Sequence, residues 1–163
     1  MRADWTIAIL AAALAVSSSS PVWAAETPRQ LQVERNSERV MPFRMDTATH
    51  SFVATPTGGV QTVTVRNGER QQILLVRSHL RKEARAFARG DFTDPAAIHG
   101  PTMPGLQALH DGAKRLSVHY SELRGGAAIT YTTSDPALVA ALHAWFKAQA
   151  SDHGAHATMT MKM

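Results

Sequence analysis

Residues 58–65 read GGVQTVTV, a glycine pair followed by an alternation of β-branched and polar residues. The stretch before it, ATHSFVAT (48–55), alternates in the same way, and the two are joined by a turn rich in Pro, Thr and Gly. Together they predict a β-hairpin. From 69 to 89 the apolar period lengthens, which predicts a helix with one buried face. That face carries Ile73, Val76, Leu80, Ala84 and Phe87, and Gly90 is expected to end the helix.

The same order of patterns returns in the second half of the chain. RLSVHYSEL (115–123) and GGAAITYT (125–132) both alternate, and Asp135-Pro136 has the signature of a helix start. The helix expected over 135–150 would bury Leu138, Leu142, Trp145 and Phe146. Hairpin, helix, hairpin, helix predicts an α+β two-layer sandwich, in which a ββα-ββα antiparallel four-stranded sheet carries two helices on one face. Whether the two halves arose by duplication stays open.

Four segments divide the chain. Residues 1–24 have the pattern of a signal peptide, with cleavage expected after Ala24, although an uncleaved anchor is an alternative. Residues 25–45 are polar and are expected to be a flexible arm. Residues 46–151 form the predicted domain, including a long loop after residue 90 with at most a short helix at 104–110. Residues 152–163 read as a His/Met-rich tail, and the expected location is periplasmic or secreted.

The composition is unusual in having eight histidines and no cysteine. Disulfides, thiolate metal sites, cysteine nucleophiles and covalent c-type haem are therefore excluded. The net charge of +4 includes Arg77, Arg81, Arg85 and Arg89, which recur every four residues. On a helix these arginines would lie along one side. We interpret that side as a solvated face, and the alternative is a surface that binds anions. Binding to nucleic acid is not expected of an exported protein.

Several histidines stand beside other metal ligands. His79 and Glu83 lie one helical turn apart and could chelate one ion. His143 borders the apolar face of its helix, and His99 lies in the long loop. The tail adds further donors, which are Asp152, His153, His156, Met159 and Met161. We expect His79, Glu83, His99 and His143 to converge on one site that the tail supplies or completes. The alternative is that these are unrelated surface or hydrogen-bonded residues.

Imidazole and thioether donors without thiolate favour copper ion. Zinc, held by His and carboxylate alone, and non-covalent haem are alternatives. The chain has no Gly-x-Ser-x-Gly, His-Glu-x-x-His or phosphate-loop motif. The sequence therefore predicts an exported copper-binding protein in metal handling, and an enzyme is less expected. A small His-dependent metallo-enzyme, a haem-binding protein and a plain interaction domain remain alternatives.

Three stretches, MPFRMDTATHSF (41–52), GDFTDPAAIHG (90–100) and TTSDPALVAALHAWF (132–146), resemble a family of small exported bacterial proteins. The resemblance covers nearly the whole predicted domain, and some members bear the name aspartate carbamoyltransferase. Such enzymes bind carbamoyl phosphate through Ser-Thr-Arg-Thr and His-Pro-x-Gln segments, neither of which occurs here. The resemblance thus implies an exported domain but no carbamoyl-transfer activity.

Overall fold

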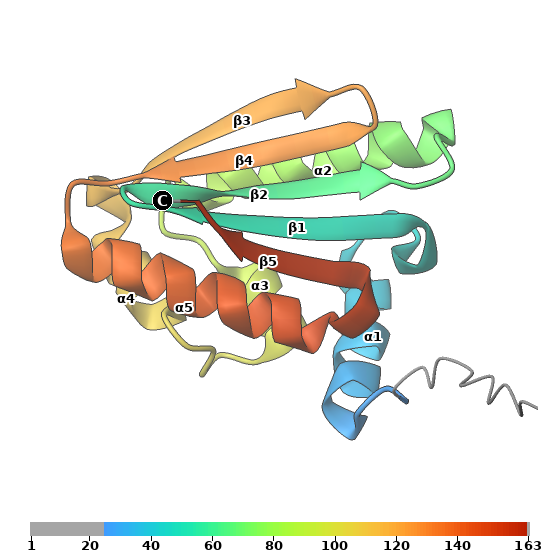
Figure 1. Ribbon diagram of the computed structural model, residues 1–163, viewed down its shortest axis with the longest axis horizontal. Helices are drawn as coiled ribbons and strands as arrows, with labels where there is room; N and C mark the ends of the chain where they lie inside the picture. The colour runs from blue at the N-terminus through green and yellow to red at the C-terminus, as the bar shows by residue number, and fades with distance from the viewer. Residues whose placement is uncertain (1–24, 163) are drawn as a thin grey trace, which may run out of the picture.

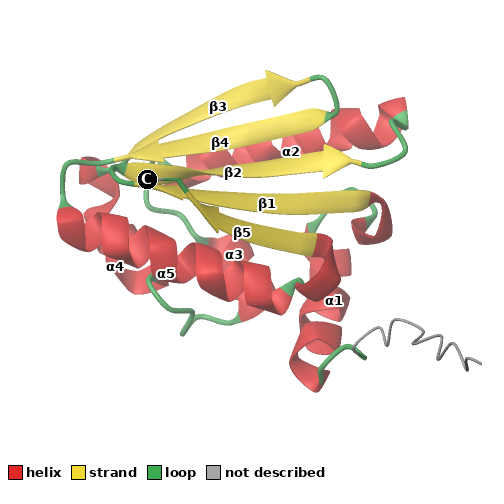
Figure 2. Cartoon of the chain, in the orientation of Figure 1, coloured by secondary structure: helices red, strands yellow, loops and turns green. Residues whose placement is uncertain are grey.

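The computed structural model describes residues 25–162, and the predicted signal peptide lies outside these residues. The fold is α+β: helices pack on an open sheet of five strands in the order β3-β4-β2-β1-β5 (Figures 1 and 2). All neighbours are antiparallel except β1 and β5, which are parallel. The strands are β1 (Ala48–Thr55), β2 (Gly58–Val65), β3 (Ser117–Leu123), β4 (Gly126–Thr132) and β5 (Ala157–Met161).

The two predicted hairpins and the two long helices are present. The β1–β2 hairpin is followed by α2 (Arg70–Phe87), and the β3–β4 hairpin is followed by α5 (Pro136–Asp152). Helix α5 begins as expected, since the Asp135 side chain accepts a hydrogen bond from the Ala137 amide and Pro136 occupies the first turn. Gly90 adopts a φ of 81° just beyond α2, which suits its role as the end of that helix.

Gly58 and Gly126 explain why both hairpins carry a glycine pair. A Cβ atom on Gly58 would lie 2.0 Å from the carbonyl oxygen of Tyr131, and one on Gly126 would lie 2.0 Å from that of Val63. Any side chain there would push the neighbouring backbone away. The two glycines therefore permit the close pairing of β2 with β4, which joins the two hairpins into one sheet.

Aromatic contacts show that α2 and α5 share one face of the sheet. The ring centroids of Phe87 in α2 and Trp145 in α5 lie 5.7 Å apart, and each ring also packs near Tyr131 of β4. Leu80 and Leu142, the two residues expected in the core, are buried. The two long helices therefore pack on one face of the sheet, as predicted.

Three parts of the prediction need correction. The arm expected to be flexible forms helix α1 (Pro28–Val40), which begins with a capping box between Thr27 and Gln30. The tail supplies β5, so the sheet has five strands and not four. The long loop contains two short helices, α3 (Thr93–His99) and α4 (Leu106–Gly112).

Within residues 25–162 we find no helix that combines the length and the apolar character needed to span a bilayer.

Candidate metal centre

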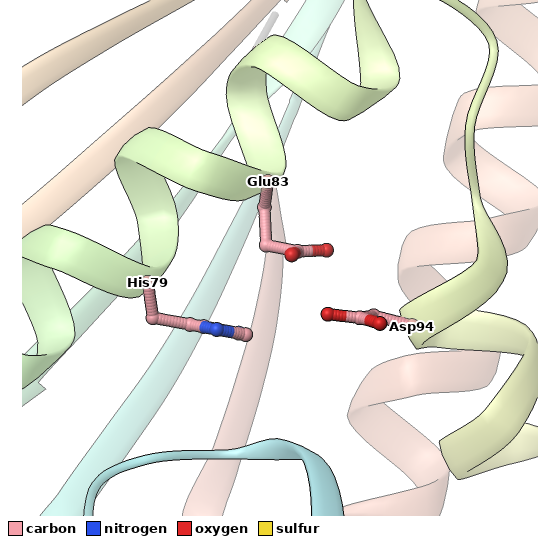
Figure 3. Close-up of side chains that lie close together, drawn as sticks. All are labelled: His79, Glu83 and Asp94. Atoms are coloured by element: carbon pink, nitrogen blue, oxygen red, sulfur yellow. The ribbon is translucent and has the colours of Figure 1, made fainter.

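Helices α2 and α3 bring three potential metal ligands together. His79 and Glu83 lie on consecutive turns of α2, and Asp94 lies in the first turn of α3. Figure 3 shows the two α2 side chains and the Asp94 carboxylate pointing toward one another across the space between the helices. Helix α3 begins here because the Asp91 carboxylate accepts a hydrogen bond from the Thr93 amide, and Pro95 fits in the first turn.

The three residues are close enough to share an ion. One ligand atom from each of His79, Glu83 and Asp94 lies within 4.8 Å of the other two. His79 and Glu83 are buried, and Asp94 is partly buried. Bonds of about 2 Å from each atom to one central ion would need only small side-chain movements.

Burial and neighbouring charges shift the pKa values of the residues in this cluster. Burial raises the pKa of Glu83 to about 8, and the neighbouring Asp94 carboxylate adds to the increase. Burial lowers the pKa of His79 to about 4, which keeps its imidazole neutral at pH 7. Lys82 partly compensates the negative charge, with its Nζ 2.7 Å from Asp94 Oδ2 and 3.7 Å from Glu83 Oε1. A bound divalent ion would favour the ionised form of Glu83 and accept the lone pair of neutral His79.

The cluster lines a small cavity of about 30 Å³ between α2, α3 and the sheet. This volume holds roughly two water molecules. Apolar side chains make up much of its lining, namely those of Met41, Phe43, Val63, Leu80, Phe87, Pro95, Ile98 and Ile129. Apart from the cluster, the polar and titratable residues in the lining are His50, His99, Gln61 and Gln149.

The four residues predicted to converge on one site do so only in part. His79, Glu83 and His99 line the same cavity, whereas His143 does not. The Nε2 of His143 donates to the carbonyl oxygens of Gly58 at 2.8 Å and Thr55 at 3.1 Å. Thr55 ends β1, and His50, which lines the cavity, lies about 16 Å earlier along that strand. The inclusion of His143 was wrong, because its ring caps the β1–β2 turn instead.

The predicted ligands of the tail divide into two groups. Asp152 and His153 lie at the end of α5 beside His99, and His156 follows in a short 3-10 turn. Met159 and Met161 belong to β5, where they alternate with exposed threonines. Met159 packs against the core and Met161 is 74 % exposed. The spacing of the methionines at every second position therefore reflects a β-strand, and neither lines the cavity.

Two residues of this region, Asp94 and His50, were not among the predicted ligands. Asp94 was not identified as a ligand because the segment that contains it was expected to be a loop. His50 lies on β1 and is 2 % exposed. Its position beside the ends of α3 and α5 follows from tertiary packing that the strand pattern does not encode.

Comparisons with protein families, with curated proteins and with solved structures yielded no significant match for this chain.

Proposed function

We propose that this protein binds a divalent metal ion between α2 and α3, with His79, Glu83 and Asp94 as its protein ligands. The observation that carries the proposal is the approach of three ligand atoms to within 4.8 Å of one another at a largely buried position. Burying two carboxylates side by side is costly unless a cation or a shared proton compensates their charge. A bound ion would compensate both and also use the neutral imidazole.

The donor atoms favour zinc over copper as the first candidate. One imidazole nitrogen and two carboxylate oxygens suit zinc, which commonly takes three protein ligands of these types and a water molecule. Copper was expected from imidazole and thioether donors together, but Met159 and Met161 do not line this cavity, and its one methionine, Met41, is not part of the cluster. Manganese, which prefers carboxylate and water, is the next candidate.

The size of the cavity limits what can bind at this site. About 30 Å³ accommodates an ion with a water molecule but neither a porphyrin nor an organic substrate. We therefore infer that the protein takes part in metal handling. We also propose that this role lies in the periplasm or outside the cell, which the signal-peptide pattern of residues 1–24 supports.

Isothermal titration calorimetry of the mature chain with Zn²⁺, Mn²⁺ and Cu²⁺ tests the proposal. His79→Ala and Asp94→Asn should each weaken Zn²⁺ binding at this site by at least about tenfold, since each removes or weakens one of three ligands. The matched control is His119→Ala, an exposed histidine on β3. Unchanged Zn²⁺ affinity in both cluster variants would contradict the proposal, and the cluster would then be a carboxyl pair that shares a proton.

A further inference from the structure

Three buried histidines from distant parts of the chain meet beside the candidate metal centre. They are His50 of β1, His99 at the end of α3 and His153 just after α5, which are 2 %, 4 % and 7 % exposed. The rings of His50 and His153 stack with centroids 4.7 Å apart, and the His153 and His99 rings meet edge to face at 4.9 Å. None of the three belongs to the His79/Glu83/Asp94 cluster.

His99 has the hydrogen-bonding arrangement that is common for histidines that bind metals, in which one ring nitrogen contacts a carboxylate. Its Nδ1 lies 2.8 Å from Oδ2 of Asp152, and a carboxylate in this position keeps the proton on Nδ1. The Nε2 atom of His99 then presents a free lone pair. Arg29 of α1 fixes the carboxylate through two hydrogen bonds, of 2.9 Å to Oδ1 and 2.6 Å to Oδ2. Arg29 also donates to the backbone carbonyl of His99.

His50 gives an independent indication of a missing ligand. Neither of its ring nitrogens has a hydrogen-bond partner among the described residues, although both are buried. A buried polar group without a partner costs about 1–3 kcal/mol, and such groups commonly mark an ion or a bound water. Burial, with help from His99, lowers the pKa of His50 to about 3, so its imidazole is neutral at pH 7. A buried neutral imidazole without a hydrogen-bond partner has a lone pair that a metal ion can use.

We propose that His50, His99 and His153 form a second metal site, which binds copper. Three imidazoles without carboxylate are a softer set than the first cluster, and copper is the divalent ion that such nitrogen donors bind most tightly. His156, whose Nδ1 is buried without a partner, lies three residues beyond His153 and is available as a fourth donor. Asp152 and Arg29 act as positioning residues, since they orient His99 and do not contact the ion.

Binding requires one change of geometry. The planes of the His50 and His153 rings differ by only 11°, and the lone pairs of an imidazole lie in its plane. Two stacked rings cannot aim their nitrogens at one ion, so one ring must turn when copper binds. We assign this movement to His153, which at 7 % is the most exposed of the three residues and lies at the end of α5.

The proposal uses residues outside the first cluster and stands if that cluster binds nothing. It is tested on the mature chain with Cu²⁺, by calorimetry and by electron paramagnetic resonance of frozen solutions. The variants are His50→Leu, His153→Gln and Asp152→Asn, with the double variant Glu83→Gln/Asp94→Asn to remove the first site. His119→Leu on exposed β3 is the matched control, and circular dichroism monitors folding of each apo protein.

We expect wild type, the control and the Glu83→Gln/Asp94→Asn protein all to show a Cu²⁺ site with splitting from several imidazole nitrogens. His50→Leu and His153→Gln should each weaken this binding at least about tenfold and reduce the number of coupled nitrogens, and Asp152→Asn should weaken it by about 10–100-fold. Retention of the wild-type spectrum and affinity in both His50→Leu and His153→Gln would overturn the proposal. So would loss of copper binding only in the Glu83→Gln/Asp94→Asn protein, which would assign copper to the first cluster.

Discussion

His99 and Asp152 are 53 residues apart in the chain, yet Nδ1 of His99 lies 2.8 Å from Oδ2 of Asp152. Arg29 also donates to this carboxylate, from Nη2 to the same Oδ2 atom and from Nε to Oδ1. The three residues come from α3, α5 and α1, so one hydrogen-bond network ties these three helices together. Burial by itself would raise the pKa of Asp152, but the hydrogen bonds with His99 and Arg29 outweigh burial and lower it.

Asp152→Asn should therefore destabilise the protein in a pH-dependent way. A lowered folded-state pKa means that the carboxylate stabilises the fold at pH values above its unfolded pKa near 4, and that this stability is lost as the pH falls through the folded pKa. We expect a loss of about 1–3 kcal/mol at pH 7 and a smaller loss at pH 3. Urea titrations at both pH values measure it.

The control for Asp152→Asn is Asp46→Asn, which removes an exposed carboxylate 3.8 Å from Arg44. Exposed pairs of this kind contribute little to stability. An equal, small effect of the two substitutions at pH 7 would mean that the Asp152 network does not support the fold.

Glu83 should have the opposite pH dependence. Its folded pKa is raised to about 8, whereas an unfolded glutamate titrates near 4.3. The folded protein thus retains a proton that the unfolded chain has lost, and the free energy of unfolding falls as the pH rises from about 4 to about 8. The maximum slope from this one group is about 1.4 kcal/mol per pH unit.

Glu83→Gln should remove that slope, so that its stability relative to wild type increases from pH 5 to pH 8 in metal-free buffer. Glu38→Gln, an exposed site on α1, is the control and should leave the slope intact. Parallel stability profiles for wild type and Glu83→Gln would show that Glu83 does not carry a raised pKa. Saturating Zn²⁺ should abolish the difference in slope by favouring the ionised carboxylate.

Residues 157–163 can be deleted to test the structural role of the C-terminal strand. β5 pairs with β1 from His50 to Ala54, and Met159 packs against the core. Deletion should therefore lower the melting temperature of the apo protein by several degrees, since loss of about 1 kcal/mol shifts it by roughly 2–8 °C. Thermal unfolding followed by circular dichroism measures the shift. An unchanged melting temperature would support the original interpretation of these residues as a tail.

The core can be tested at Leu142, which is fully buried on α5. Leu142→Ala should cost about 2–5 kcal/mol, since it removes buried methyl groups and leaves a cavity. Leu74→Ala, at a 52 % exposed position of α2, is the control and should cost much less. A denaturant titration that gives less than about 0.5 kcal/mol for Leu142→Ala would mean that the helix face is misassigned.

The spacing of apolar residues predicted those elements whose buried face recurs at a regular interval along the chain. Both hairpins and both long helices fall in this group. Helix α1 was missed because only Val33 and Ser37 of its residues are buried, so it has almost no apolar period. Its signal was the capping box begun by Thr27, and its stability comes from polar contacts with distant residues, such as the hydrogen bond from Asn36 to the carbonyl of Ile98.

The candidate site shows the same limit. His79 and Glu83 could be paired from the sequence because helical spacing alone puts them on one side of α2. Asp94 could not be added, because its approach depends on how α3 packs against α2. Met159 and Met161 were assigned as ligands although their alternation has two possible causes, metal binding and a β-strand. The pairing of β5 with β1 shows that the alternation belongs to a strand.

X-ray diffraction at the zinc absorption edge, from crystals of residues 25–163 grown with Zn²⁺, tests the central claim most directly. We predict an anomalous peak about 2 Å from the ligand atoms of His79, Glu83 and Asp94. An anomalous map with no peak between α2 and α3, from crystals that show zinc elsewhere on the protein, would contradict it.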